Sequence, residues 1–452
     1  MKKLVLVVLI ALCAGFALRS FALSQQRVYP WVYYFEQTID CAFADAEGNV
    51  IVSTGDWGSG TYNWGTGDTT YWYSFKGMFR IREGEMEAIE CPADTFVLDC
   101  ATDSAGTTWV LFAEGQSYTE HTGEPPWRSG TGESDIGFRG WRFPIGPPGT
   151  GTLTDYRLGH IDNDELVELP GVTQSIPGTP ARLSSGPDGC LYLESNEWDG
   201  NRVTAHFLSW WRTDSLPHVG LQIDRILPYG NLWGYPEFGP DGLAYFLFYC
   251  YQDSSIRSGV LSVDPLTGQW HIFDDVSSPY LNSETEYFYI DPLNIKWFAT
   301  DDGLVRFDGE TWMCYTTENS GLPYNLVRQM VYDEIDDVYY IISQGNPAIG
   351  PFGARSYPYA FSTFAPDGEC IGEPLDLPLS SDDLYYQSEI YETAQNVFWL
   401  SPFGTGVVYS YDHEQVVQWH VGDWFPPAQV AYIGSTALGR TFCAVGSCVM
   451  IW

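Results

Sequence analysis

Short runs in which apolar and polar residues alternate recur along most of the chain. This period of two is typical of half-buried β-strands, because successive side chains point to opposite faces of a sheet. No long segment repeats its apolar residues every 3.6 positions, as an amphipathic helix does. Aromatic and β-branched residues fill the runs, and Gly, Asp, Asn and Pro separate them. The pattern predicts an all-β protein with almost no helix.

The clearest unit spans residues 286–323 and contains four apolar runs, at 287–290, 295–300, 304–307 and 311–315. The segments between the runs carry Asp, Asn and Gly, which tolerate positive φ or cap turns with their side chains. We therefore expect four antiparallel strands joined by tight turns.

The opening strand–turn–strand of this unit occurs eight times in all. The other occurrences are at 44–52, 102–110, 185–192, 238–245, 332–339, 391–399 and 434–442. Four-stranded repeats of about 40–50 residues are typical of propeller blades. We predict a single β-propeller of four-stranded antiparallel blades, with eight blades favoured and seven if one occurrence is spurious. The aromatic segment 27–35 is expected to supply a strand to the last repeat and so to close the ring.

One repeat also resembles a known family. Residues 297–309, Trp312, 315–317 and 320–325 resemble the two-component regulator propeller repeat, with the best agreement over 291–333. That repeat is known from periplasmic sensor domains of hybrid histidine kinases, so the resemblance implies a propeller and a sensing or scaffolding role. The sequence has no counterpart of the membrane span, kinase and DNA-binding parts of those proteins.

The first 24 residues have the features of a secretory signal peptide. Lys2 and Lys3 precede an apolar stretch at 4–18, and small residues at 20–24 offer cleavage sites. A membrane anchor is the alternative, although Arg19 interrupts the short apolar run. We expect residues 25–452 to form the propeller and to be secreted or periplasmic, in a bacterium.

The chain is strongly acidic, which restricts its partners. Without residues 1–24 it keeps 18 of its 21 basic residues against 58 acidic ones, a net charge of about −40 that repels nucleic acid and anionic membranes. Only Lys76 and Lys296 remain as lysines. We expect a monomer that does not insert into a membrane.

Cysteines and acidic clusters predict no cofactor, with calcium as the one alternative. Cys443 with Cys448, and Cys91 with Cys100, are candidate local disulfides, and no Cys/His set has zinc spacing. Acidic clusters stand at 162–165, 274–275, 301–302, 333–337 and 382–383. They are expected to be solvated turn residues, with bound calcium as the alternative.

The links between consecutive repeats carry the first candidate binding site. In a propeller these links crowd around one end of the central channel, where aromatic side chains stack on sugars or grip peptides. The alternative is that they fill gaps between blades. The candidate residues are Trp233, Tyr235, Tyr280, Tyr324, Asn325, Tyr385, Tyr386 and Trp424.

The second candidate is an insertion at 115–151, which is too long for an ordinary blade turn. It concentrates aromatic and basic side chains on an acidic protein, a mixture that suits a contact surface. A flexible surface loop is the alternative. The candidate contact residues are Trp127, Arg128, Arg139, Trp141 and Arg142.

No local motif predicts catalysis. Residues 103–109 read Asp-x-x-Gly-x-x-Trp, one position longer than the sialidase Asp-box, which favours a structural turn. The seven histidines are scattered, and no Gly-x-Ser-x-Gly elbow is present. We therefore expect a non-catalytic binding module. The alternative is a propeller-type glycoside hydrolase or polysaccharide lyase that assembles histidine and carboxylate side chains from several blades.

Overall fold

The computed structural model describes residues 31–452 except for 36–37, 60–68, 83, 93–94, 115–116, 123–153, 170–175, 200–201, 213–217, 228–229, 253–254, 282–283, 346–347, 350–354, 357–358, 366–388, 393–397, 402–406, 412–415, 421–429, 437 and 446–447. The predicted signal peptide therefore lies outside the described residues.

The described residues are nearly all in antiparallel sheets, numbered 1 to 8 along the chain. Sheets 1 and 2 contain β2 (Thr38–Ala44), β3 (Val50–Ser59), β4 (Thr69–Arg82) and β5 (Glu85–Ile89), then β6 (Thr95–Thr102), β7 (Thr108–Glu114), β9 (Thr154–Asp162) and β10 (Glu165–Leu169). Sheets 3 and 4 contain β11 (Thr179–Ser185), β12 (Cys190–Asp199), β13 (Arg202–Arg212) and β14 (His218–Gln222), then β15 (Gly230–Phe238), β16 (Ala244–Gln252), β17 (Ser255–Val263) and β18 (Trp270–Phe273).

Sheets 5 and 6 contain β19 (Thr285–Ile290), β20 (Lys296–Thr300), β21 (Gly303–Phe307) and β22 (Trp312–Tyr315), then β23 (Leu326–Asp333), β24 (Val338–Gln344) and β27 (Tyr359–Phe364). Sheets 7 and 8 contain β28 (Glu389–Glu392), β29 (Phe398–Ser401), β30 (Val407–Tyr411) and β31 (Val416–His420), then β32 (Val430–Ser435), β33 (Thr441–Val445), β34 (Cys448–Ile451) and β1 (Trp31–Tyr34). The described helices are short: α2 (Ile223–Ile226) and the 3₁₀ turn η3 (Pro279–Leu281).

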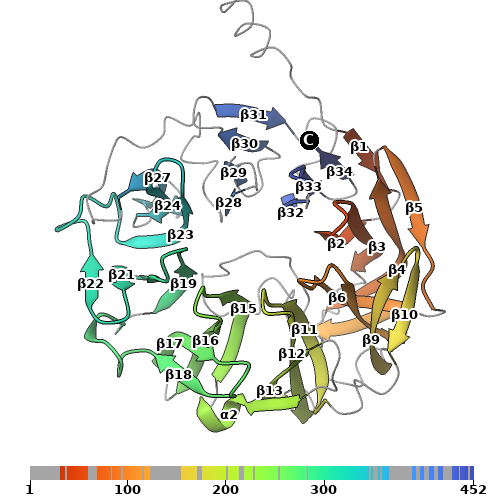
Figure 1. Ribbon diagram of the computed structural model, residues 1–452, viewed down its shortest axis with the longest axis horizontal. Helices are drawn as coiled ribbons and strands as arrows, with labels where there is room; N and C mark the ends of the chain where they lie inside the picture. Colours follow the sequence, from red (N-terminus) through yellow and green to blue (C-terminus); the bar gives the residue numbers. More distant parts are fainter. Residues whose placement is uncertain are drawn as a thin grey trace, which may run out of the picture.

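The sheets stand around a common centre, with the first strand of each sheet innermost and the last at the rim (Figure 1). The N-terminal strand β1 is an exception in sequence order, because it pairs with β34 from Trp31↔Ile451 to Tyr34↔Cys448. It lies within the segment 27–35 that was predicted to add a strand to the last repeat. Sheet 8 therefore combines the two ends of the described chain.

The predicted strand–turn–strand units are the first hairpins of the sheets. In six of them the N–H of the first turn residue donates to the fifth carbonyl, and the N–H of the fourth donates to the first. Where Asp stands first, its carboxylate also accepts from the fifth N–H at 2.8 Å, as at Asp45, Asp103 and Asp291. The repeated Asp and Gly positions therefore encode one turn geometry, which is why they were visible in the sequence.

The near-match to the sialidase Asp-box is such a turn. Asp103 accepts hydrogen bonds from the backbone of Ala105 and Thr107 and from the indole N–H of Trp109, at 2.8–2.9 Å. Asp103 and Trp109 are both buried. The structural interpretation of this motif is confirmed.

Sheets 3 and 4 use a variant of the turn, with Gly first and Asp third. A Cβ added at Gly186 would lie 2.5 Å from the Asp188 carboxylate, and one at Gly239 would lie 2.4 Å from the Asp241 carboxylate. The first residue must be Gly here because the carboxylate of the third residue occupies the space that its side chain would fill.

Hydrophobic clusters join each sheet to the next. Separate clusters join sheets 8 and 1, 1 and 2, 2 and 3, 3 and 4, 4 and 5, 5 and 6, and 6 and 7. Between sheets 7 and 8, the rings of Trp419 and Trp452 lie 5.4 Å apart. The core is thus a series of packed interfaces between sheets, which suits side chains that alternate along each strand.

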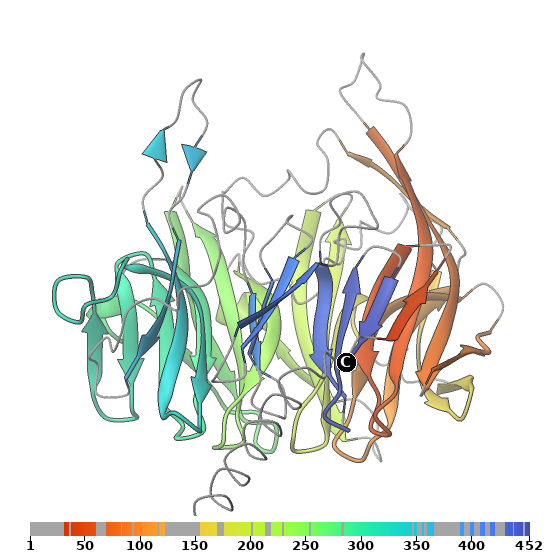
Figure 2. The ribbon, with the colours of Figure 1, turned by 90° about the horizontal axis from the view of Figure 1, so that it is seen from above.

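Two additions extend from the same side of the array, as Figure 2 shows. The short strand β8 (Ser117–Thr122) leaves sheet 2 and pairs with residues 69–74 of β4 in sheet 1. The hairpin of β25 (Ala348–Ile349) and β26 (Arg355–Ser356) is inserted between β24 and β27. The first described part of the predicted insertion at 115–151 is therefore a strand that reaches the neighbouring sheet.

The described cysteines are free thiols, so the two candidate disulfides are absent. Cys443 faces Met450 and Cys448 faces Val445 across the β33–β34 ladder, which makes the two cysteines diagonal neighbours. Diagonal Cα atoms are about 7–8 Å apart, beyond the roughly 6.8 Å that a disulfide spans. Among the residues that the structure describes, no helix is long and apolar enough to cross a membrane.

Candidate functional site

The antiparallel order of the strands assigns the connections to two faces. The turn face carries the first-hairpin turns at 45–49, 103–107, 186–190, 239–243 and 291–295. The link face carries the links to the next sheet, such as 274–284 and 316–325, together with β8 and the β25–β26 hairpin. The described insertions and the candidate residues Tyr280 and Tyr324 therefore share the link face.

Tyr280 is held outward on the link face. It occupies the middle of η3, and its side chain is 44% exposed. Its neighbours Ser278 and Leu281 are buried, and the Ser278 hydroxyl accepts a hydrogen bond from the backbone N–H of Tyr280. The link is thus anchored on both sides of Tyr280, and nearly half of this residue is exposed to solvent.

The aromatic residue of the second described link is less exposed to solvent. Tyr324 is half-buried, next to Leu322, which is packed in the core between sheets 5 and 6. The side-chain oxygen of Asn325 accepts a hydrogen bond from the backbone N–H of Thr317 at 2.8 Å. Asn325 thus ties the link together with this oxygen, and Tyr324 stays a predicted contact residue.

The structure describes the other candidate residues only in part. Trp233 and Tyr235 belong to β15, where pairing with β16 is irregular between Trp233 and Glu237, and their side chains lie outside what is described. The remaining candidates fall in the gaps of the described chain, namely Tyr385, Tyr386, Trp424, Trp127, Arg128, Arg139, Trp141 and Arg142.

Two carboxyl groups crowd together on the link face, those of Glu284 and Asp301. Glu284 directly precedes β19, Asp301 follows β20, and the backbone N–H of Asp301 donates to the carbonyl of Glu284. Burial raises the pKa of both groups, and each is raised further by a neighbouring carboxylate, Asp301 for Glu284 and Asp302 for Asp301. Crowded carboxyl groups with raised pKa values are typical of functional sites.

A buried ion pair lies beneath these carboxyl groups. The guanidinium of Arg328 on β23 pairs with the carboxylate of Glu286 on β19 and also donates to Gln344. Glu286 and Arg328 are each the extra residue of a β-bulge, since neither has an opposite partner on the adjacent strand. A bulge redirects side chains, and here two bulges join sheets 5 and 6 through one ion pair.

Sheet 3 holds a separate group of the buried residues Glu194 and His206 with the half-buried Arg182. The Glu194 carboxylate lies 3.5 Å from both the Arg182 guanidinium and His206 Nε2. Burial alone would raise the pKa of Glu194, but Arg182 and His206 outweigh that effect and lower it. All three residues belong to adjacent strands of one sheet, so this group differs from the multi-blade histidine site expected of a propeller hydrolase or lyase.

Three of the acidic clusters proposed for calcium have a member engaged in protein contacts. Asp164 pairs with Arg80, and Asp274 with Arg257, while Asp333 accepts from the backbone N–H of Ile335. No group of three or more His, Cys, Asp or Glu side chains in the described part of the chain is arranged to hold a metal ion. Calcium binding by this protein stays a prediction.

Sequence reasoning missed Glu284, Asp301 and Arg328 as a group. Glu284 precedes a strand, Asp301 lies in a hairpin turn and Arg328 lies in a bulge of the next sheet. No spacing in the sequence indicates that they are close together. Asp301 and Asp302 were noted only as a turn cluster. A bulge inserts a residue without leaving a residue-type signature, so Glu286 and Arg328 looked like ordinary strand residues.

Comparisons with known proteins found similar solved structures but no matching family. No protein-family model matches the chain, and no curated protein matches it. It is similar to the solved structure of a catalytically inactive virginiamycin B lyase from Staphylococcus aureus with quinupristin, at 12% identity over 80% of this chain and 95% of that one, with a TM-score of 0.44. It is also similar to YCF48 from Cyanidioschyzon merolae, at 9% identity over 80% and 96%, with a TM-score of 0.41.

A third similar structure is the extracellular domain of the putative one-component system BT4673 from B. thetaiotaomicron. The identity is 11% over 91% of this chain and 64% of that one, with a TM-score of 0.25. These neighbours are β-propeller proteins. Because the TM-scores lie below 0.5, the ligands and activities of these neighbours carry no weight for this chain.

Proposed function

We propose that this chain is an eight-bladed, closed β-propeller that binds a carbohydrate or peptide ligand on its link face and catalyses no reaction. Support for eight blades comes from sheets 1 to 8, each of which begins with one of the eight repeated units. Support for closure comes from the pairing of β1 with β34 and from the cluster that joins sheets 8 and 1. A fixed ring of sheets leaves the connections free to carry a ligand site.

The observation that carries the binding proposal is the outward position of Tyr280 on the face that also holds every described addition to the array. Tyr280 is 44% exposed in an anchored link, and β8 and the β25–β26 hairpin rise on the same side (Figure 2). A rigidly held, half-exposed aromatic ring is suited to stacking on a sugar or an apolar peptide side chain, because little entropy is lost on binding.

The experiment compares the binding of a Tyr280 variant and a Trp270 variant on glycan and peptide arrays. Tyr280→Ala is expected to weaken the array ligand by about 2 kcal/mol, as loss of a central aromatic contact does. Trp270→Ala is the matched control, since Trp270 is 47% exposed but lies on the rim strand β18. Equal binding by wild type and Tyr280→Ala, or equal losses in both variants, would contradict the proposal.

A hydrolase or lyase is the second candidate, supported by the crowded Glu284 and Asp301 on the same face. A carboxyl group with a raised pKa serves as a general acid near neutral pH. If this is its role, Glu284→Gln abolishes turnover of the array glycan while binding persists. Unchanged glycan after prolonged incubation with wild-type protein would eliminate this candidate.

Export and sensing complete the proposal. An amino-terminal signal at 1–24 would place the propeller outside the cytoplasm, and the resemblance of residues 291–333 to the two-component regulator propeller repeat favours a sensing or scaffolding role. Cell fractionation of the producing bacterium tests the location. N-terminal sequencing of the exported protein, with a first residue close to 25, tests the cleavage.

A further inference from the structure

Three aliphatic side chains extend into solvent from turns of three consecutive sheets. Leu266 in the turn between β17 and β18 is 75% exposed, and Leu293 and Ile335 in the first hairpins of sheets 5 and 6 are 67% and 59% exposed. Since adjacent strands are antiparallel, the turn after β17 lies on the turn face with the first hairpins. Pro240 and Pro292 are exposed in the same region. The turn face of sheets 4 to 6 therefore presents apolar side chains to water.

The same hydrogen bond holds each of these three residues in its turn. The carboxylate of the Asp two positions earlier accepts from the backbone N–H of the aliphatic residue, at 2.8–2.9 Å. The three acceptors are Asp264, Asp291 and Asp333. A Pro follows the Asp in two of the turns, which restricts the backbone further. The aliphatic residues are thus held in stiff turns, and little conformational freedom is lost when a partner covers them.

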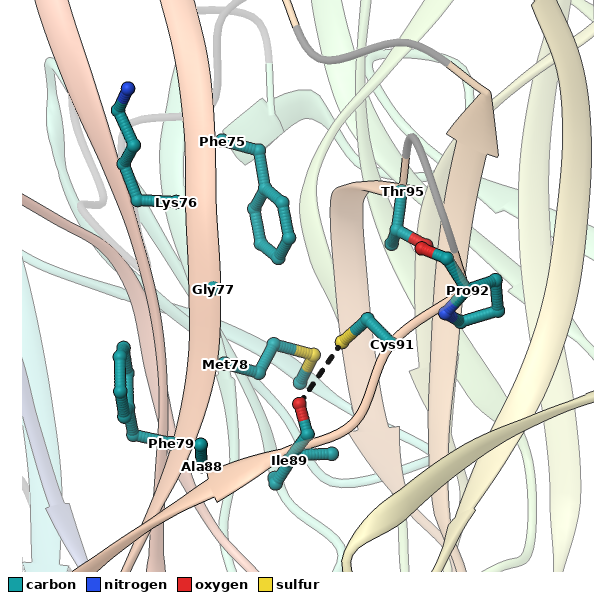
Figure 3. A pocket seen from close by; sticks show the side chains of 10 residues that line it. All are labelled: Phe75, Lys76, Gly77, Met78, Phe79, Ala88, Ile89, Cys91, Pro92 and Thr95. Carbon is teal, nitrogen blue, oxygen red and sulfur yellow. Dashed lines mark hydrogen bonds between the residues drawn. The ribbon is translucent and has the colours of Figure 1, made fainter.

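The turn itself does not require an aliphatic residue at this position. In sheet 2 the carboxylate of Asp103 accepts the same bond from the backbone N–H of Ala105, at 2.9 Å. Apolar side chains of sheets 1 and 2 are directed inward, as Figure 3 shows for Met78, which points from β4 toward Cys91. A single exposed aliphatic residue is ordinary, but three on one face of consecutive sheets are typical of an interaction surface.

The charges of the turns around these side chains are of one sign. The described turns on this face of sheets 4 to 6 contain nine Asp or Glu residues and no Lys or Arg, at 239–243, 264–269, 291–295, 308–311 and 333–337. Two of the nine are buried. The nearby Lys296 already pairs with Asp241 at 3.0 Å. Likewise, Arg306 pairs with Asp308 at 2.9 Å. The aliphatic side chains therefore stand in an acidic surface.

We propose that the turn face of sheets 4 to 6 docks a basic amphipathic helix of a partner protein. The apolar stripe of the helix contacts Leu266, Leu293 and Ile335, and its basic side chains contact the surrounding carboxylates. Charge complementarity favours this occupant, because like charges across an interface are rejected. A second copy of this chain brings 58 acidic residues against 21 basic ones, and nucleic acid and anionic membranes are also negative. This surface goes beyond the proposed function, because it lies on the face opposite to Tyr280.

The first test varies the ligand and leaves the protein unchanged. The probe is a fluorescein-labelled Leu/Lys peptide of about 14 residues, roughly 21 Å long as a helix, with its Leu residues on one face. One control peptide has Glu in place of every Lys, and another has the same residues in an order that gives no apolar face. Fluorescence polarisation with the full chain at low salt is expected to show at least tenfold weaker binding of both controls. Equal binding of the reordered peptide, or no binding of the amphipathic one, would overturn the proposal.

The second test removes the aliphatic contacts from the protein. Leu293→Ser and Ile335→Ser keep the backbone N–H that the turn needs, and each is expected to weaken the amphipathic peptide at least fivefold. Val276→Ser is the matched control, because Val276 is 83% exposed in a link on the other face and its loss leaves binding unchanged. Circular dichroism checks that all three variants fold. Equal losses in all three, or no loss in the first two, would contradict docking on the turn face.

The third test separates this surface from general attraction to an acidic protein and from the link-face site. Glu334→Gln on the turn face is expected to weaken the peptide at low salt and to have no effect at high salt, where charges are screened. Glu318→Gln, at an exposed residue of the link 316–325, is expected to leave binding unchanged. Tyr280→Ala is also expected to leave it unchanged. Equal losses in the two Glu variants, or a loss in Tyr280→Ala, would overturn the proposal.

Discussion

Asp241 on the turn face and the pair Glu284 and Asp301 on the link face have opposite surroundings. On the turn face, Asp241 accepts from Tyr245, Lys296 and the backbone of Leu243. These bonds outweigh burial, which would act in the other direction, and lower the pKa of Asp241. On the link face, burial and neighbouring carboxylates raise the pKa values of Glu284 and Asp301. The carboxylate of Asp241 is thus satisfied by donors, while Glu284 and Asp301 are crowded by other carboxylates.

The difference indicates on which face the residues and the lengths of the connections can vary. Six of the first-hairpin turns reproduce the same backbone bonds, so these backbone groups are already paired within the protein. The link face has no such repeated requirement and carries β8, the β25–β26 hairpin and the exposed ring of Tyr280. We therefore expect the ligand-binding residues on the link face, where the repeat requires no fixed set of hydrogen bonds.

Both faces depend on the circular array, and the largest expected effect comes from breaking it. Deletion of residues 23–36 removes β1 and its ladder with β34, and exposes the side of sheet 8. The loss is expected to rival the ~5–15 kcal/mol total stability of a typical domain. Thermal melting measures it, and a deletion that ends before Trp31 serves as the control. Equal melting temperatures for the two deletions would argue against closure by β1.

The next largest effect distinguishes buried from exposed turn carboxylates. Asp291 accepts from Trp297 Nε1, the Tyr339 hydroxyl and two backbone N–H groups, and all three side chains are buried. Asp291→Ala leaves these donors unsatisfied and is expected to cost about 3 to 5 kcal/mol.

Asp308 provides the matched comparison for Asp291. It accepts an equal number of hydrogen bonds, from Glu310, Thr311 and Arg306, in an exposed turn. Because water replaces these bonds, Asp308→Ala is expected to cost about 1 kcal/mol or less. Urea unfolding of both variants measures the difference, and similar losses would show that burial does not distinguish them.

A pH series compares the carboxyl groups of the two faces directly. Glu284 has a raised pKa when folded, so its contribution to stability is complete at acidic pH and is lost as the pH rises through that value. Glu284→Gln is therefore expected to melt above wild type at pH 7 and to match it near pH 4. Asp241 has a lowered pKa, so its contribution is present at neutral pH and is lost on acidification. Asp241→Asn should accordingly melt below wild type at pH 7, with the gap closing in acid.

The outcome of these melts decides whether the faces differ. Opposite signs for the two variants at pH 7 support the contrast between them. The same sign for both at pH 7 would mean that the surroundings of Glu284 and Asp241 are electrostatically alike.

The smallest expected effect on stability belongs to Tyr280. Since its ring is 44% exposed, Tyr280→Ala is expected to change the unfolding free energy by less than about 1 kcal/mol. A large loss, of the ~3–5 kcal/mol typical of a buried aromatic residue, would mean that the ring fills a gap between sheets. Thermal melting of this variant, measured with its array binding, separates the two interpretations of the link residues.

The sequence alone was sufficient for the fold class and the hairpins. The alternation of side chains and the Asp and Gly turn positions are local requirements of a strand and a tight turn, so they appear directly in the order of residues. The unit at 286–323 was correct strand by strand, and the segment 27–35 contains β1.

Only the tertiary structure decided which distant groups meet. The ion pair of Arg328 with Glu286 and the addition of β8 to β4 each join residues of different sheets. They depend on bulges and on where ladders end, and neither requires a particular residue type. The sequence likewise offered Cys443 and Cys448 as a disulfide because they are close along the chain, and the ladder register places them diagonally. Strands and tight turns require particular residue types, whereas contacts between sheets arise from the register and the packing of the whole array.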